Sequence, residues 1–251
     1  MRVVLLICVA AASAVAAPKT LPASWKRCKE GEPLFEQCLS EAIEVALADL
    51  GANGARELGV FPLDPLFISK VVIEQGSGPV SIDLQFTDLN IYGLRNARVA
   101  SESVKASFKT PVYLSGKADI AEGLTLKGQY KINGKVLVLP IQGEGECELN
   151  LENVTALVDL VCKDETKDGL RYASVDNFKF LLDTTLLKIR MDNLFNGNKE
   201  LSANMNTFLN ENWREIFLEL RPAIQDAFGI AFREITNRIF SKVPIDKLLL
   251  S

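Results

Sequence analysis

The architecture of this chain is decided by residues 201–242, LSANMNTFLNENWREIFLELRPAIQDAFGIAFREITNRIFSK. Apolar residues recur in this stretch every three or four positions, which predicts one long amphipathic helix. The helix would be about 60 Å long at 1.5 Å per residue, with a bend at Pro222 because proline removes a backbone donor. Its apolar stripe includes Phe208, Trp213, Phe217, Ile224 and Phe228. A stripe of this length needs an equally long apolar partner in the same molecule.

That partner is expected between about residues 69 and 188, where apolar and polar residues alternate as they do in β-strands. The alternation is regular over residues 80–86 and 124–132. Asn133-Gly134, which follows the second run, is typical of a tight hairpin turn. One apolar face per strand indicates an antiparallel sheet that is covered on one side.

Two of these strands change phase part of the way along, near Asp88 and near Asn153. A phase change without a glycine or proline turn is typical of a β-bulge in a long, bent strand, although two unrelated hairpins would also produce it. Long bent strands make a strongly curved sheet. The predicted fold is therefore α+β, with a strongly curved antiparallel sheet wrapped around the long C-terminal helix.

The N-terminus has the form of a secretory signal peptide. Arg2 precedes an unbroken run of apolar and small residues at positions 3–16, and this run ends in the small-x-small pattern Ala14-Val15-Ala16. The run is too short for a membrane anchor, which needs about 20 apolar residues. We expect residues 1–16 to be the signal peptide, residues 17–251 to form a single domain, and the mature protein to be secreted, extracellular and soluble.

Four cysteines remain in the mature chain, and an even number in an oxidising compartment favours disulfides over metal binding. Helical spacing from Pro33, which suits the first helical position, to about Leu50 predicts a helix. Cys38 lies early in that helix and Cys28 lies in the loop before it. We therefore expect a disulfide between Cys28 and Cys38 that fastens the N-terminal arm to the helix.

The pairing of Cys147 with Cys162 depends on what the chain does at Asn153. A single extended strand would hold the two sulfurs about 50 Å apart at about 3.3 Å per residue, whereas a turn at Asn153 would bring them near enough to bond. The even cysteine count favours the bond. Asn153-Val154-Thr155 is also an N-glycosylation sequon, which a turn would expose and a covered strand would not.

Composition limits the chemistry of the chain. The sequence contains no histidine, which excludes Ser-His-Asp and Cys-His nucleophile systems and imidazole ligands for zinc. Hydrolysis by carboxylates alone has no support, because the acidic residues are scattered over faces that are expected to be solvated. A formal net charge of −4 with mixed signs gives no footprint for nucleic acid or anionic lipid. We expect no enzyme, no cofactor, no metal and no stable membrane insertion.

Several motifs stand in fixed order along the C-terminal part of the chain. NLFNGN at residues 193–198 is followed by FLNENW at residues 208–213, LRPA at residues 220–223 and IFSKVP at residues 239–244. Together they resemble the insect takeout and juvenile-hormone-binding-protein family. The early cysteine pair, Asp64-Pro65-Leu66 and the strand that begins at Gly143 match in kind. The resemblance covers essentially the whole mature chain.

The resemblance implies a long helix wrapped in a curved antiparallel sheet around an internal hydrophobic tunnel, similar to one half of bactericidal/permeability-increasing protein. Aromatic residues are the type that lines pockets for apolar ligands. We expect the tunnel to be lined by Phe86, Tyr130, Phe178, Phe208, Trp213, Phe217, Ile224 and Phe228. Tyr130 is the candidate for orienting a polar head group, with an ordinary buried tyrosine bonded to backbone as the alternative.

Members of the family are secreted carriers of hydrophobic ligands, and none is known as an enzyme. The first interpretation is therefore a monomeric secreted carrier of juvenile hormone, another terpenoid or a fatty-acid-like molecule. The alternative is a secreted signalling or interaction protein whose interior is filled by side chains. Periodicity alone does not distinguish a packed core from a tunnel.

Overall fold

The computed structural model of the chain describes residues 18–76 and 78–250. The predicted signal peptide, residues 1–16, lies outside the described residues. Within them the helices are α1 (Phe35–Ala52), α2 (Lys199–Glu211), α3 (Trp213–Phe240) and α4 (Ile245–Leu248). The strands are β1 (Leu66–Gln75), β2 (Val80–Tyr92), β3 (Arg98–Val99), β4 (Lys105–Ser107), β5 (Tyr113–Ile120), β6 (Leu124–Val136), β7 (Leu139–Glu152), β8 (Val154–Lys167), β9 (Leu170–Asp183) and β10 (Leu186–Met191).

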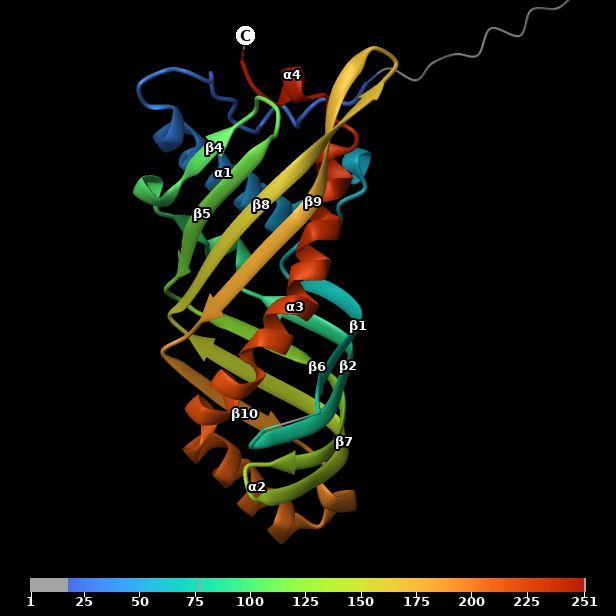
Figure 1. Cartoon of the computed structure of the whole chain (residues 1–251). Coiled ribbons are helices and arrows are strands. Elements are labelled where there is room, and N and C mark those ends of the chain that lie inside the picture. The colour runs from blue at the N-terminus through green and yellow to red at the C-terminus, as the bar shows by residue number, and fades with distance from the viewer. Residues whose placement is uncertain (1–17, 77, 251) are drawn as a thin grey trace, which may run out of the picture.

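The described strands form two antiparallel sheets rather than the one continuous sheet that the alternation predicted. The first sheet has the order β1-β2-β6-β7-β10, and the second has the order β3-β5-β8-β9 with β4 added beside β5. The helix α3 runs along both sheets, mainly against β9 and β1 (Figure 1). The prediction of an α+β fold with antiparallel strands around a long C-terminal helix is confirmed.

In the described residues the chain passes between the two sheets four times, at residues 92–98, 120–124, 152–155 and 183–186. We call the last three of these crossings the junction. The pairs Ile120–Val154 and Thr155–Asp183 lie on the second-sheet side, and Leu124–Leu151 and Leu186–Glu152 lie on the first-sheet side. Through these crossings the chain forms two sheets that pack against the same helix, α3.

The phase changes have two different origins. At Asp88 the register between β2 and β6 shifts and Asp88 has a φ of 51°, so the predicted bulge is confirmed. At Asn153 the chain makes no hairpin, because β7 pairs with β6 and β10 while β8 pairs with β5 and β9. The single residue Asn153 breaks the ladder where the chain leaves one sheet for the other.

The hairpin turn expected at Asn133-Gly134 is wrong. Both residues lie inside β6, between β2 and β7, and the chain turns four residues later around Leu137, whose φ is 53°. Gly134 serves a different purpose, since a Cβ there would lie 2.3 Å from the carbonyl oxygen of Ser81 in β2. Glycine is needed here for close approach of a neighbouring strand, and pairing on both sides overrides the local turn signal.

The long C-terminal helix breaks at Asn212 and not at Pro222. Asn212 has φ −109° and ψ 17°, and its side-chain Nδ2 donates to the carbonyl of Phe208 at 2.8 Å, which ends α2 before α3 begins. Pro222 stays inside an uninterrupted α3. Both Pro222 and Leu218 are exposed, so water can bond the carbonyl that the proline leaves free.

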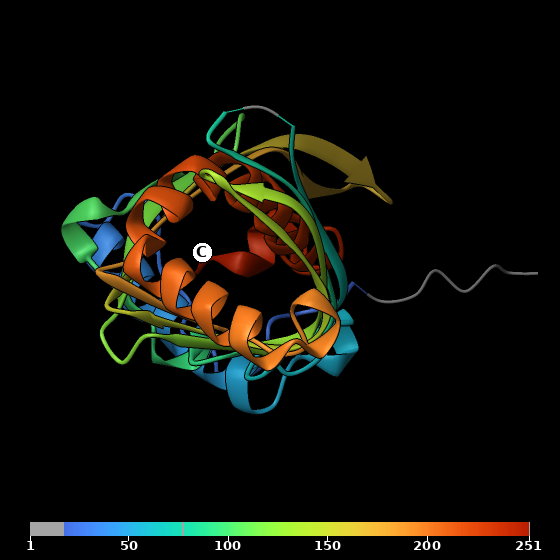
Figure 2. The same ribbon diagram turned by 90° about the horizontal axis from the view of Figure 1, so that it is seen from below.

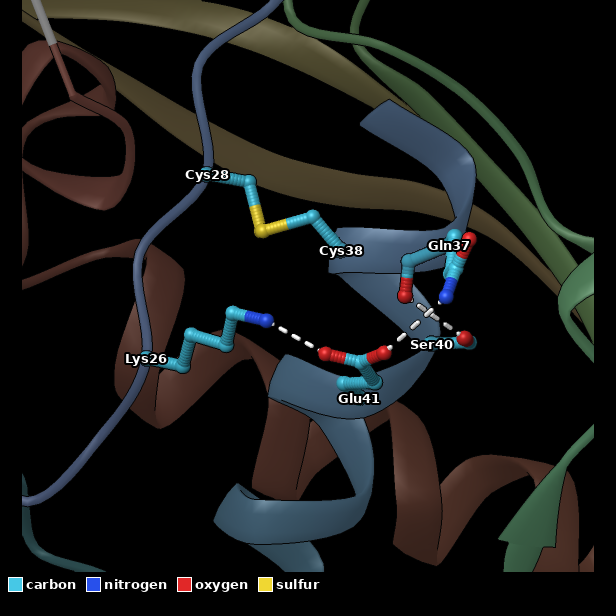
Figure 3. Close-up of a disulfide and its surroundings, with 6 residues drawn as sticks. All are labelled: Lys26, Cys28, Gln37, Cys38, Ser40 and Glu41. Carbon is cyan, nitrogen blue, oxygen red and sulfur yellow. Dashed lines mark hydrogen bonds and ion pairs between the residues drawn. A yellow bond between two sulfur atoms is a disulfide. The ribbon is translucent and has the colours of Figure 1, made fainter. Parts of the chain in front are cut away.

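The N-terminal arm is fastened to α1 as predicted. Cys28 and Cys38 form a disulfide with their Cα atoms 5.8 Å apart, and Lys26 forms an ion pair with Glu41 one turn further on (Figure 3). The arm also holds the other end of the chain, because the amide of Leu250 donates to the carbonyl of Cys28 at 2.8 Å. The helix itself is shifted slightly from its prediction and runs over Phe35–Ala52.

Candidate functional site

An apolar cavity lies mainly between the first sheet and α3, and β9 of the second sheet and α2 also contribute to its lining. The volume of this cavity is about 130 Å³. Every lining residue in the described part of the chain is apolar. The lining is Ile73, Ile82, Leu84, Phe86, Ile91, Leu94, Leu124, Leu126, Ile132, Val136, Leu149, Leu151, Phe180, Leu182, Leu187, Ile189, Met191, Leu209, Ile216, Phe217, Leu220, Ile224, Phe228 and Phe232.

The alternation of each strand explains why this lining is so uniform. In β2 the buried and accessible positions alternate from Val80 to Phe86, which sends Ile82, Leu84 and Phe86 to the interior. α3 then presents the residues of its stripe toward the same space. A void of about 150 Å³ lined by Leu, Ile and Phe stays dry and can bind benzene, so a space of this size and chemistry is a place for apolar atoms and not for water.

Four of the eight predicted lining residues lie at this cavity. They are Phe86 from β2 and Phe217, Ile224 and Phe228 from α3. The correct positions are those where strand alternation and helix periodicity point to the same interior.

The other four predicted lining residues lie elsewhere. Phe178 and Phe208 are partly buried and lie away from the lining. Trp213, at the start of α3 beside the break at Asn212, lines a polar hollow on the outer surface. The prediction assumed one helix without a break at Asn212, and on such a helix Trp213 would face the interior. The break at Asn212 changes the direction of Trp213 and explains the error.

Tyr130 is the fourth of these residues, and the structure supports the plainer alternative for it. It is 3% exposed, and its hydroxyl donates to the carbonyl oxygen of Asp192 at 2.7 Å. Burial raises the pKa of Tyr130 above its ordinary value. The hydroxyl holds the chain after β10 and is not directed at the cavity.

The chain segment that Tyr130 holds is seated on glycines of β7. Gly143 pairs with Leu194 in an isolated bridge, and a Cβ at Gly143 would lie 2.9 Å from the Cα of Leu194. A Cβ at Gly145 would lie 2.6 Å from the carbonyl oxygen of Asp192. The Gly143-x-Gly145 spacing therefore lets the start of the NLFNGN motif lie directly on the sheet at the edge of the cavity.

Amide side chains of α2 cover the free edge of the first sheet. Asn206 accepts from the amide of Met191 at 2.9 Å and donates to its carbonyl at 2.8 Å. Asn210 does the same to Ile189, at 2.9 and 2.7 Å. Four helix residues rise about 6 Å and two strand residues about 6.6 Å, so the two spacings match. α2 thereby lies beside β10 along the rim of the ring of strands (Figure 2), and its Leu209 joins the cavity lining.

Most of the lining was not predicted, because it is aliphatic and the prediction was based on aromatic residues. Leucine and isoleucine at the alternating positions of β6, β7 and β10 make up much of it. Phe180, an aromatic residue on an alternating strand, was expected in the interior and does line the cavity, whereas Phe232 was not expected there. The two rings meet edge to face with centroids 5.0 Å apart. Alternation identified the face on which these residues lie, and the error was to give weight to residue size.

The predicted bond between Cys147 and Cys162 is wrong. Both are buried free cysteines, on β7 and β8, and these strands belong to different sheets. The chain does not fold back at Asn153, so the two strands that carry them never face each other. Burial raises the pKa of each thiol to about 11, which keeps both protonated and unreactive near neutral pH.

Two kinds of feature were not found in the described residues: a cluster of metal-ligating side chains and a helix able to span a membrane. Among residues 18–76 and 78–250, no three histidine, cysteine, aspartate or glutamate side chains gather as a metal would need. No helix in the same ranges is long and apolar enough to span a membrane.

The chain as a whole is similar to known proteins in sequence and in structure. Residues 3–250 match the model of the family described as haemolymph juvenile hormone binding protein (JHBP). The circadian clock-controlled protein daywake of Drosophila melanogaster is 30% identical over 244 residues, covering 93% of this chain and 90% of daywake. Daywake of Drosophila yakuba is 28% identical over 242 residues, covering 92% and 89%. The crystal structure of Epiphyas postvittana takeout 1 is 25% identical with a TM-score of 0.74, covering 90% of this chain and 100% of that one.

Proposed function

This chain belongs to the haemolymph juvenile hormone binding protein family, and from that membership we propose that it is a secreted, monomeric carrier of a small neutral hydrophobic molecule. The observation that supports the proposal is the cavity between the first sheet and α3, whose lining is apolar throughout. Burial of each 100 Å² of apolar ligand surface would contribute about 2.5 kcal/mol. The same lining offers no acid, base or nucleophile, so the proposed role is binding without catalysis.

The lining also favours one class of ligand over another. Transfer of a carboxylate from water to an apolar site without a partner costs several kcal/mol of desolvation free energy. The cavity offers it neither a cation nor a hydrogen-bond donor. A fatty acid would have to keep its head in water. A terpenoid ester of the juvenile-hormone type carries no charge and can enter completely, so we favour a neutral terpenoid or ester over a free fatty acid.

A matched pair of ligands tests this preference. Farnesoic acid and its methyl ester share one hydrocarbon chain and differ in charge at pH 7. We expect the ester to bind at least about tenfold more tightly, a difference of about 1.4 kcal/mol. Lowering the pH toward the pKa of the acid should narrow the gap by strengthening only the binding of the acid. Equal affinities at pH 7 would contradict a cavity that excludes charge.

The size of the cavity supports the second candidate, a secreted interaction protein with a filled interior. Typical small-molecule sites have volumes of about 300–1,000 Å³, whereas this space is about 130 Å³. A terpenoid would require lining side chains to move apart. Organic extraction of the purified protein, followed by mass spectrometry, separates the two: a co-purified lipid or terpenoid supports the carrier. An empty extract, together with no displacement of a bound fluorescent lipid, supports the interaction protein.

A further inference from the structure

A polar hollow lies on the outside of the molecule at the junction of the two sheets. Its volume is about 650 Å³, and it shares no lining residue with the apolar cavity. Lys117 of β5, Asn153 between β7 and β8, Thr185 before β10, and Trp213 and Arg214 at the start of α3 all line it. The carrier function does not use this hollow.

Asn153, at the rim of the hollow, is the first residue of the sequon Asn153-Val154-Thr155. It is exposed, and its φ of 47° is a left-handed conformation that asparagine tolerates well. Its side-chain Nδ2 donates one hydrogen bond, to the hydroxyl of Thr185 at 3.0 Å. An amide nitrogen carries two hydrogens, so one can be replaced while the other keeps this bond.

We propose that Asn153 carries an N-linked glycan whose first sugar lies in the hollow against Trp213. The inference rests on the proposed secretion of the chain, because the donor is a lipid-linked oligosaccharide diphosphate in the secretory pathway. In the transfer, Nδ2 of Asn153 forms a bond to C1 of the first N-acetylglucosamine. The bond from C1 to the diphosphate breaks, the lipid diphosphate leaves, and Nδ2 loses one proton.

The residues around Asn153 suit a sugar better than an isolated ion. Trp213 is partly exposed, and the guanidinium of Arg214 lies over its ring at 5.6 Å from the centroid. A pyranose would pack its C–H face against the part of the ring that Arg214 leaves open. The charged neighbours already have partners: Arg214 donates to Asp183 and to the carbonyl of Thr184, both at 2.9 Å, and Lys117 pairs with Asp119 at 2.9 Å. A neutral, hydroxyl-rich group can bond to such paired charges without disrupting them.

Position adds a structural reason for a glycan here. The hollow is bordered by strands β5, β8 and β9 of the second sheet, by residues of the junction and by the start of α3. The crossing at Asn153 is a single residue, and the crossing beside it is held by Thr185, whose amide donates to the carbonyl of Glu152 at 3.0 Å. A sugar between Asn153 and Trp213 would connect the strands to the helix at the junction.

Peptide mapping of the full chain secreted from insect cells tests the modification. Release of the glycan by peptide N-glycosidase in heavy-oxygen water should convert Asn153 to labelled aspartate. Asn153→Gln should lose the mass of one glycan, and Thr155→Ser should keep it, because serine preserves both the sequon and a hydroxyl for the bond to Asp119. A secreted chain with unmodified Asn153 overturns this inference alone, whereas a chain that is not translocated also overturns the proposed secretion.

Tryptophan fluorescence tests the place of the first sugar. The chain has two tryptophans, and Trp25 is 9% exposed and lies on the N-terminal arm. Removing the glycan should therefore increase acrylamide quenching and shift the emission to the red, and both changes should disappear in Trp213→Phe. Identical quenching before and after release would show that the glycan points away from Trp213 and would overturn this part of the inference.

Discussion

Leu39 and Leu220 offer a matched test of the cavity. Both are leucines inside helices, α1 and α3, and their exposed fractions are 7% and 6%. Leu220 lines the cavity and Leu39 does not. Truncation to alanine removes the same atoms from two equally buried positions. At Leu220 those atoms already border empty space, whereas at Leu39 they do not.

The two truncations should differ in cost. A packed leucine cut to alanine costs about 2.7–5 kcal/mol, because the loss of burial adds to the cost of a new cavity. We expect about 4 kcal/mol for Leu39→Ala. Leu220→Ala should cost only about 2 kcal/mol, because part of its surface already lacks packing partners. At about 2–4 °C per kcal/mol the melting temperature should fall by about 8–16 °C and 4–8 °C.

Ligand binding provides the second half of the test. A ligand at 100 times its Kd stabilises the native state by about 2.7 kcal/mol and raises the melting temperature measurably. Leu220→Phe should fill part of the space, leaving the unliganded melting temperature near that of the parent and abolishing the shift caused by ligand. Leu39→Ala should keep the shift. Equal costs for the two alanine variants, with a full ligand shift in Leu220→Phe, would refute the reasoning.

Three further predictions concern the disulfide, the two free cysteines and the packing of α2 on β10. Replacing Cys28 and Cys38 together with serine opens a loop between cysteines 10 residues apart; calorimetry should show a loss of about 3 kcal/mol, and an unchanged melting temperature would contradict it. Cys147 and Cys162 should resist alkylation in the native protein and react after denaturation without reductant, whereas a linked peptide pair would restore the rejected bond. Asn210→Ala removes two hydrogen bonds to β10 and should lower the free energy of unfolding by about 2 kcal/mol. Hydrogen exchange of the backbone amides should then be faster in α2 than in α3. Equal exchange rates would argue against α2 being held by its asparagine side chains.

Local periodicity was enough to predict the elements but not their junctions. Alternation placed Ile82, Leu84 and Phe86 on the buried face of β2 because a strand must turn alternate side chains inward. Asn133-Gly134 led to a wrong prediction because its turn preference is local. In the fold both residues pair with β2 on one side and with β7 on the other, which keeps them inside a strand. The outcome at such a position depends on partners that are distant in sequence.

The cysteines and the cavity show a second limit of the sequence. An even number of cysteines supports disulfides only if the topology brings them together, and the crossing at Asn153 separates Cys147 from Cys162. In the same way, a buried face can be predicted, but a space left between two faces cannot. Packing decides whether Phe228 meets another side chain or a void, and no residue pattern records that difference.

The disulfide and the proposed binding cavity lie in different parts of the molecule. The disulfide, α1 and the N-terminal arm lie at the end of the second sheet (Figure 1), while most of the cavity lining comes from the first sheet and α3, with Phe180 and Leu182 added from β9. α3 is the element common to both, and its packing on β9 and β1 connects the two ends. Loss of the disulfide should therefore lower the melting temperature with little change in ligand affinity. Substitutions on the inward face of α3 should change both, because the same residues complete the core and line the cavity.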